Sequence, residues 1–270
     1  MAFNADTTEK IYSIPVDKES FSIQDIDVFG DHLIAGAGGG VKIFEKMTDR
    51  ELYSNKTLER ESPVKTLKNV GMSWDGNGMI CFMRRGANDD EWTEEKIPSG
   101  VPEITFIEEG EGSRLVIATE YGGILVWDIE ERKVVPPEEP VQLRAWRLTV
   151  NFPHVCVIGG PLWNGLVVLN LVAGKRIRHV ETHLGLYKIH RNSRFVLVMT
   201  KDELIMYDIE ELQNESIKDA DLWSRRMSFS TDYYLNAVCN ATKFAVSDGK
   251  KLTVYDVWKD RDYEVVPDES

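Results

Sequence analysis

The stretch "RLVIATEYGGILVWDIEE", residues 114–131, decides the fold of this chain. An apolar run leads into a turn with two glycines, and a second apolar run ends in an aromatic residue and an acid. Two short apolar runs joined by a glycine-containing turn predict a β-hairpin. The question is whether this hairpin stands alone or is one of a series.

The same pattern recurs along the chain. The other copies are "HLIAGAGGGVKIFEK" (32–46), "HVCVIGGPLWNGLVVLNL" (154–171), "FVLVMTKDELIMYDIEE" (195–211) and "KFAVSDGKKLTVYDVW" (243–258). The aligned anchors Phe44, Trp127, Leu169, Tyr207 and Tyr255 are spaced by 83, 42, 38 and 48 residues. Because the first gap is about two repeats long, we assign the missing copy to residues 78–97, with Trp92 as its anchor and 84–90 as its loop. The chain therefore holds six units.

Each unit also has a short extended segment before and after its hairpin. Four short strands at a period near forty residues are typical of β-propeller blades. A β-sandwich is the other all-β possibility, but it gives no reason for the same aromatic–acid ending at near-constant spacing. We predict an all-β fold and one β-propeller domain over residues 1–270, with six blades, or seven as the alternative. The expected blades span about 22–58, 64–98, 102–138, 142–181, 185–230 and 233–268.

Two segments compete to complete the last blade. Residues 11–16 and residues 263–267 both read as the same outer strand, and the sequence does not choose between them. A third possibility is that the chain is part of a longer protein or lends an edge to a partner.

These repeats resemble the WD-repeat family of β-propellers. The residues that carry the resemblance are "VWDI" (126–129), "MYDI" (206–209) and "VYDV" (254–257), with weaker matches at "KIFE" and "VVLN". Only Trp127–Asp128 is a literal Trp-Asp pair, and no Gly-His pair begins any unit. The hydrogen-bond network that the family builds from those residues is therefore expected to be mostly absent.

The glycines of "LIAGAGGGVKIF" (33–44) do not form a phosphate-binding loop. Such a loop needs a following helix to supply aligned N–H groups, and here the turn runs directly into an apolar strand. Glycine is instead expected where a hairpin turn needs a positive φ. No G-x-S-x-G elbow occurs, and no Cys or His spacing is typical of a metal site. We therefore expect no cofactor and no metal.

Charge and composition limit the partners. The formal net charge is −13, which argues against direct binding of nucleic acid because such proteins usually carry a basic face. No apolar segment is long enough to span a bilayer, and the first residues have no apolar signal region. The three cysteines are unclustered, which is typical of reduced, buried thiols in a cytoplasmic or nuclear protein.

What remains is recognition of a protein or peptide within a multi-subunit complex. The resemblance implies that partners dock on the face formed by loops between second and third strands and by links from one blade to the next. We place Arg84 and Arg85, Tyr121, Trp163 and Lys201 on that face. Trp163 lies in a Pro/Asn/Gly loop with no periodic reason to be core, and the two arginines could receive an acidic or phosphorylated peptide.

We therefore predict a non-catalytic interaction module that acts as a scaffold or recruits a substrate or partner. The alternative is a propeller hydrolase with a metal ion in its central channel, for which the candidate carboxylates are Asp89, Asp90, Glu120, Asp202 and Glu203. A weaker alternative is an RNA-associated processing factor, which the net charge disfavours. Residues 210–223 form a longer, helix-like insert towards the opposite face, either a decoration, a second contact or a flexible segment.

Overall fold

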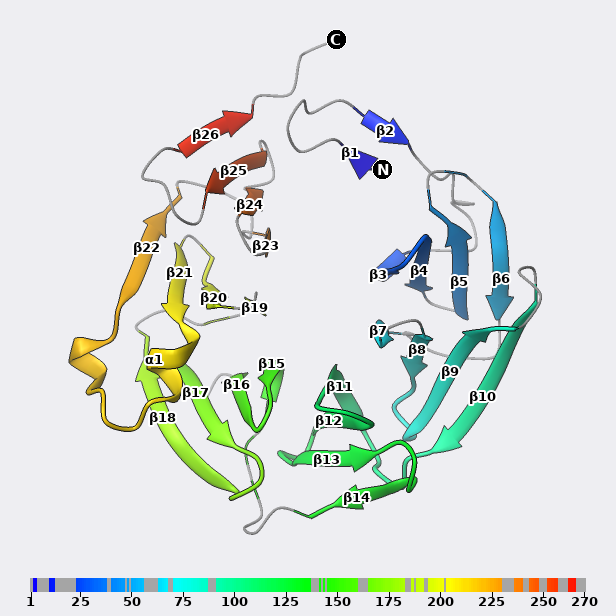
Figure 1. Cartoon of the computed structure of the whole chain (residues 1–270), viewed down its shortest axis with the longest axis horizontal. Helices are drawn as coiled ribbons and strands as arrows, with labels where there is room; N and C mark the ends of the chain where they lie inside the picture. Colours follow the sequence, from blue (N-terminus) through cyan, green and yellow to red (C-terminus); the bar gives the residue numbers. More distant parts are fainter. Residues whose placement is uncertain are drawn as a thin grey trace. The chain divides into compact units, whose positions relative to one another are not determined.

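A computed structural model shows a chain built almost entirely of antiparallel β-sheets. The structure describes residues 2–3, 10–12, 23–37, 40–46, 48, 50–55, 63–67, 70–86, 91–136, 141, 143, 145–159, 165–182, 186, 188–191, 194–201, 203–229, 236–239, 243–247, 252–256 and 262–265. Within them lie six sheets of four strands each, which can be followed by label in Figure 1. These sheets are the blades of a six-bladed β-propeller, which confirms the fold and the blade number.

The first three sheets follow one another along the chain. Sheet 1 contains β3 (Ile23–Phe29), β4 (His32–Ala37), β5 (Gly40–Glu45) and β6 (Glu51–Asn55). Sheet 2 contains β7 (Val64–Leu67), β8 (Val70–Trp74), β9 (Met79–Arg85) and β10 (Trp92–Pro98). Sheet 3 contains β11 (Ile104–Glu109), β12 (Arg114–Thr119), β13 (Ile124–Asp128) and β14 (Lys133–Val135).

The remaining three sheets repeat the same up-and-down order. Sheet 4 contains β15 (Ala145–Asn151), β16 (His154–Gly159), β17 (Gly165–Asn170) and β18 (Lys175–Glu181). Sheet 5 contains β19 (Lys188–Arg191), β20 (Phe195–Met199), β21 (Glu203–Asp208) and β22 (Ser224–Ser228). Sheet 6 contains β23 (Asn236–Cys239), β24 (Lys243–Ser247), β25 (Leu252–Asp256) and β26 (Asp262–Val265). A separate pair joins β1 (Ala2–Phe3) to β2 (Lys10–Tyr12).

Sheet 6 decides between the two candidate closing strands. Its fourth strand is the C-terminal segment β26, which pairs antiparallel with β25 from Leu252 opposite Val265 to Tyr255 opposite Asp262. The N-terminal candidate contributes β2 to the two-stranded sheet instead, and its residues 13–16 lie outside the described part of the chain. The last blade therefore takes all four of its strands from one continuous segment.

Sheet 2 corrects the sequence-based strand assignment. Residues 84–90 were expected to join the second strand to the third, yet Arg84 and Arg85 end β9, the third strand, and Trp92 begins β10, the fourth. The strand that was overlooked is β8, whose hairpin with β9 is made by "DGNG" at 75–78. It was overlooked because β7 has only four residues and two residues separate it from β8, so both read as one apolar run.

Internal contacts divide the chain into two compact units. The first covers Met1–Glu109 and Trp127–Val134, and the second covers Gly110–Val126 and Val135–Ser270. Sheets 1 and 2 belong to the first unit and sheets 4 to 6 to the second, while sheet 3 contributes residues to both.

Sheet 5, in the second unit, explains why its strands read as unbroken apolar runs. Val196 and Val198 of β20 face a cluster that includes Cys156 and Leu166 of sheet 4. The alternate residue Leu197 faces a different cluster, formed with sheet 6 residues. Because successive side chains of a strand point to opposite faces, a sheet buried on both faces has to be apolar at every position.

The Asp or Asn that ends the third strand of sheets 3, 4 and 5 has a local role. Asp128, Asn170 and Asp208 each accept hydrogen bonds from the two backbone N–H groups that lie two and three residues further on. Asp and Asn favour this geometry because the short side chain substitutes for a backbone acceptor in a tight turn. The aromatic–acid repeat therefore marks the end of a strand and the start of a turn.

The neighbouring Trp127 contributes through packing. Its side chain is completely buried, yet among the described residues its indole N–H has no hydrogen-bond acceptor.

Candidate functional site

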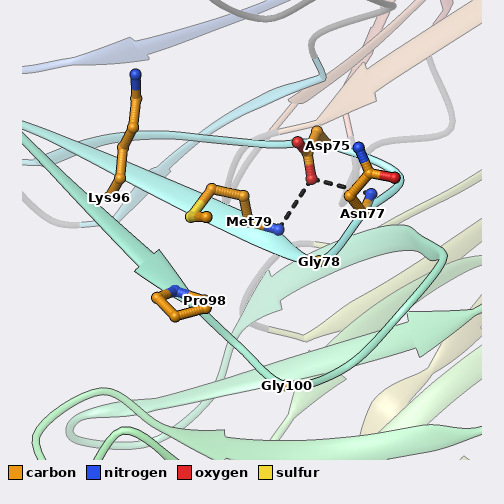
Figure 2. Close-up of a pocket in the computed structure, with 7 residues that line it drawn as sticks. All are labelled: Asp75, Asn77, Gly78, Met79, Lys96, Pro98 and Gly100. Carbon is orange, nitrogen blue, oxygen red and sulfur yellow. Dashed lines mark hydrogen bonds between the residues drawn. The ribbon is translucent and has the colours of Figure 1, made fainter.

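The described pocket with the clearest geometry lies in the first unit, at the end of sheet 2 where β8 turns into β9. It has a volume of about 360 Å³ and is open to solvent. Its lining residues are Asp75, Asn77, Gly78, Met79, Lys96, Pro98 and Gly100. Figure 2 shows the Asp75 turn on one side, the strand that carries Lys96 and Pro98 on the other, and Met79 between them.

The Asp75 side chain shapes the turn. Its Oδ1 accepts the backbone N–H of Asn77 at 3.0 Å and that of Met79 at 2.9 Å, as the dashed lines in Figure 2 show. The backbone of Asp75 also pairs with Met79 and accepts the N–H of Gly78. These bonds hold the four-residue turn "DGNG" in one conformation, and they leave the Asn77 side chain exposed at the rim.

Gly78 ties this turn to the link that leaves sheet 2. Its φ is +85°, and a Cβ at this position would lie 2.2 Å from the carbonyl oxygen of Val101, so only glycine fits. The Gly78 carbonyl accepts the Ser99 N–H at 2.9 Å and the Ser99 hydroxyl at 2.8 Å. Glu103 N–H donates to the Gly76 carbonyl at 2.9 Å. The two walls of the pocket are therefore locked together before any ligand arrives.

The floor of the pocket is apolar and its rim is polar. Met79 and Pro98 are register partners on β9 and β10, so they lie side by side on the same face of the sheet. Lys96 lies two residues before Pro98 on the same face, and its ammonium group is 2.7 Å from Glu94. A pocket of this kind accepts an apolar side chain flanked by hydrogen-bonding or charged groups.

Glu94 connects the pocket to sheet 1. Its carboxylate accepts hydrogen bonds from the Tyr53 hydroxyl and the Asn55 amide, both on β6, as well as from Lys96. Burial acts to raise the pKa of Glu94, but the hydrogen bonds from Lys96 and Tyr53 outweigh it and the pKa is lowered. The same hydrogen bond, which Lys96 donates to Glu94, raises the pKa of Lys96, so both groups stay charged at neutral pH.

Four of the five residues proposed for partner binding lie in the described part of the chain. Arg84 and Arg85 lie at the end of sheet 2 that connects the third strand to the fourth, opposite to the end that holds the pocket. The expectation that they belong to a loop between second and third strands is wrong. Trp163 lies outside the described residues, so its placement stays a prediction.

Tyr121 and Lys201 do lie in turns between second and third strands, in sheets 3 and 5. Both turns are closed in the same way, because the hydroxyl of the preceding threonine accepts a backbone N–H: Thr119 from Gly123 at 3.0 Å, and Thr200 from Glu203 at 2.9 Å. Tyr121 is 77% exposed at the tip of its turn. A large aromatic side chain held outward by a fixed turn is a typical contact residue for a protein partner.

The carboxylates considered for a metal site are only partly covered by the structure. Glu120 and Glu203 lie in the turns of sheets 3 and 5, whereas Asp89, Asp90 and Asp202 lie outside the described residues. Within the described ranges, no group of three or more His, Cys, Asp or Glu side chains is placed to hold a metal ion. In the same ranges, no helix is both long enough and apolar enough to cross a membrane.

The sequence analysis selected none of the seven pocket residues, which include Asn77, Met79, Lys96 and Pro98. The available signal was "DGNG", which is a strong hairpin sequence and would have located β8 and β9 correctly. With that register, Lys96 and Pro98 would have followed as neighbours of Met79 on the next strand. The volume of the pocket itself had no signal in the sequence.

Comparison with known proteins supports the fold alone. No protein-family model matches the chain, and no curated protein matches it by sequence. A chain in the crystal structure of the mitotic checkpoint complex superposes with a TM-score of 0.73 at 12% identity, covering 95% of this chain and 83% of that one. The computationally designed Ika8 protein superposes with a TM-score of 0.58 at 12% identity, covering 93% of this chain and 89% of that one.

Proposed function

We propose that this chain is a WD-repeat-like propeller that binds a protein or peptide partner, without catalysis, as a scaffold or recruiting subunit of a larger complex in the cytoplasm or nucleus. The observation that carries the proposal is the pocket of sheet 2. Its walls are joined by backbone hydrogen bonds, so little conformational entropy is lost when a ligand binds. Its lining combines an apolar floor with a charged and amide-bearing rim.

Two further observations support a partner rather than a small substrate. The pocket is open to solvent, which suits a side chain of an extended peptide better than an enclosed metabolite. The superposed chain of the mitotic checkpoint complex also belongs to a multi-protein assembly. Tyr121 is proposed as a second contact because it is exposed in a turn of the same kind.

The test is affinity capture from extracts of cells that express the protein, with Lys96→Glu as the site variant. The matched control is Lys133→Glu, because Lys133 is also exposed and also pairs with a glutamate, Glu131, at 2.7 Å. We expect Lys96→Glu to lose a partner that wild type and Lys133→Glu both retain, with unchanged melting temperature. Equal retention by both variants would remove the pocket from the proposal.

Tyr121→Ala tests the second contact in the same assay. Because Tyr121 is mostly exposed, its truncation should leave folding unchanged within about 0.5 kcal/mol. A partner that depends on Tyr121 but not on Lys96 would place the binding function on the turns between second and third strands and leave the pocket uninvolved.

A further inference from the structure

Two arginines from different sheets converge on the carboxylate of Glu95, on the face of sheet 2 opposite to the pocket residues Lys96 and Pro98. Arg132, in the turn between β13 and β14, places its NH2 group 2.6 Å from Oε1 of Glu95. Arg84, on β9, places its NH1 group 3.7 Å from Oε2 of the same glutamate. Glu95 lies on β10 opposite Phe82, and Phe82 and Arg84 are two residues apart, so all three side chains share one face of the sheet.

This geometry separates Arg84 from its sequence neighbour. Arg85 is opposite Trp92 in the register of β9 and β10, whereas Arg84 is opposite Thr93. Because side chains alternate along a strand, Arg84 and Arg85 point to opposite faces of the sheet. The side chain that joins Arg84 is therefore Arg132, which the sequence analysis did not select.

The cluster has unused donor capacity. At 3.7 Å the contact of Arg84 with Glu95 is an ion pair but is too long for a hydrogen bond, and none of the described residues accepts one from the Arg84 side chain. Arg132 uses one of its five N–H donors on Glu95. The side chains of Arg84 and Arg132 are 49% and 59% exposed, so both guanidinium groups are within reach of a ligand from solvent.

The charges of the cluster do not balance. Two guanidinium groups face one carboxylate, while the nearby Lys133 is already neutralised by Glu131 at 2.7 Å. The guanidinium of Arg84 also lies 5.9 Å from the centre of the Phe82 ring, which is buried and limits the positions that the arginine can adopt. Counted over the described residues, the result is a cationic site with a surplus positive charge.

We propose that Arg84 and Arg132 together bind the phosphate group of a phosphorylated serine or threonine in a partner protein. A phosphate monoester carries close to two negative charges at neutral pH and three acceptor oxygens, so it can bridge two guanidinium forks. A ligand carboxylate would offer the arginines the same single negative charge that Glu95 already offers. A dianion is needed to attract them more strongly than Glu95 does. Glu95 holds the two arginines in place, and because it partly neutralises them, a ligand has to carry more than one negative charge.

This site is separate from the pocket proposed for partner binding. Lys96 and Pro98 line the pocket on one face of β10, and Glu95 is the residue before Lys96 on the same strand. Because successive side chains of a strand point to opposite faces, Glu95 and Arg84 lie on the other face of sheet 2. Loss of one site should therefore leave the other intact, and the two proposals can fail independently.

The test uses the full chain and a blocked peptide of four alanines around a central phosphoserine, titrated while the arginine Nε–Hε signals are followed by NMR. We expect the signals of Arg84 and Arg132 to shift together on binding. Arg84→Ala and Arg132→Ala should each weaken binding by about tenfold or more, because each removes charge-assisted hydrogen bonds to phosphate. The matched control Arg85→Ala removes the same charge from the other face and should change the affinity by less than about twofold.

Two further arms separate phosphate recognition from general attraction of anions. The same peptide with glutamate in place of phosphoserine should bind at least tenfold more weakly. Glu95→Gln should reduce this ratio between the two affinities, because it removes the carboxylate that competes with the ligand for the arginines. Affinity for phosphoserine should fall between about pH 7 and pH 5.5 as the phosphate gains a proton near its second pKa of about 6. Equal loss in Arg85→Ala, or equal binding of the glutamate peptide, would overturn the proposal.

Discussion

Replacing Arg178 should destabilise the second unit, because this one side chain anchors the insert between β21 and β22. It lies on β18 and is only 6% exposed, although it carries a full positive charge. Its Nε donates to the Leu212 carbonyl at 3.1 Å, and its NH2 group donates to the carbonyls of Asn214 and Ile217, both at 2.8 Å. Its NH1 group donates to the Asp219 carboxylate. One guanidinium thus holds the whole insert between β21 and β22.

The insert consists of α1 (Ile209–Gln213) and the 3₁₀ turn η1 (Asp219–Asp221), and α1 contacts β18 and β21 (Figure 1). Arg178→Met keeps the apolar stem but removes every donor. Hydrogen bonds to a charged group contribute about 1.5–3 kcal/mol each, and they are not additive. Water can replace the donor at the exposed Asn214 but not at the fully buried Leu212. We expect a loss of about 3–5 kcal/mol in the free energy of unfolding.

Urea denaturation and amide hydrogen exchange of residues 209–223 measure this effect. Arg178→Lys keeps the charge but cannot form the forked contacts, so it should fall between wild type and Arg178→Met. Asp219→Asn is the matched control because Asp219 is 59% exposed, and it should cost about 1 kcal/mol or less. If Arg178→Met stays within about 1 kcal/mol of wild type and the insert exchanges no faster, the idea that Arg178 anchors the insert is wrong.

Three further predictions concern the core and the first unit. Trp127→Phe should lower the free energy of unfolding by less than about 1.5 kcal/mol, because no described acceptor loses a hydrogen bond. Trp127→Ala should lower it by about 3–5 kcal/mol. Equal losses for the two variants in chemical denaturation would contradict this. Burial raises the pKa of both Cys81 and Cys156 to about 12. In a Cys239→Ser background, neither thiol should therefore react with an aromatic disulfide reagent at pH 8 until the protein unfolds. Rapid labelling of the native protein would refute this prediction. Burial, opposed in part by the backbone N–H of Val64, raises the pKa of Asp25 above its unfolded value. The stability it contributes is therefore present at low pH and lost as the pH rises through the native pKa. Asp25→Asn should therefore flatten the fall in stability as the pH rises above 3.8, the ordinary pKa of an aspartate, and an unchanged slope would count against the assignment.

Much of the fold could be predicted because each blade repeats the same local instructions. Apolar runs buried on both faces, threonine- or glycine-containing turns, and an Asp or Asn that closes the next turn all depend on residues close in sequence. These features located five of the six hairpins correctly. Sheet 2 was misread because its first two strands are short and almost contiguous, so hydrophobic periodicity could not separate them.

The candidate sites were less accessible to sequence reasoning. The polar lining of the pocket comes from two strands and a link, and its cavity exists only because Gly78 lets the link approach closely. Arg84 was selected with Arg85 because they are adjacent, yet strand alternation sends them to opposite faces. Arg132 joins Arg84 only because a turn of sheet 3 reaches Glu95 on sheet 2.

Local sequence was thus sufficient for the fold class, the number of blades and the turn chemistry, because each rests on spacing within about forty residues. It left the closing strand open, since two segments carried the same pattern, and the pairing of β26 with β25 chose between them. Tertiary structure alone decided which charged groups meet: Arg178 with the insert, and Arg132 with the same Glu95 that pairs with Arg84. These contacts depend on which face of the sheet a side chain occupies and on which strand lies beside it. The spacing of residues along the chain specifies neither.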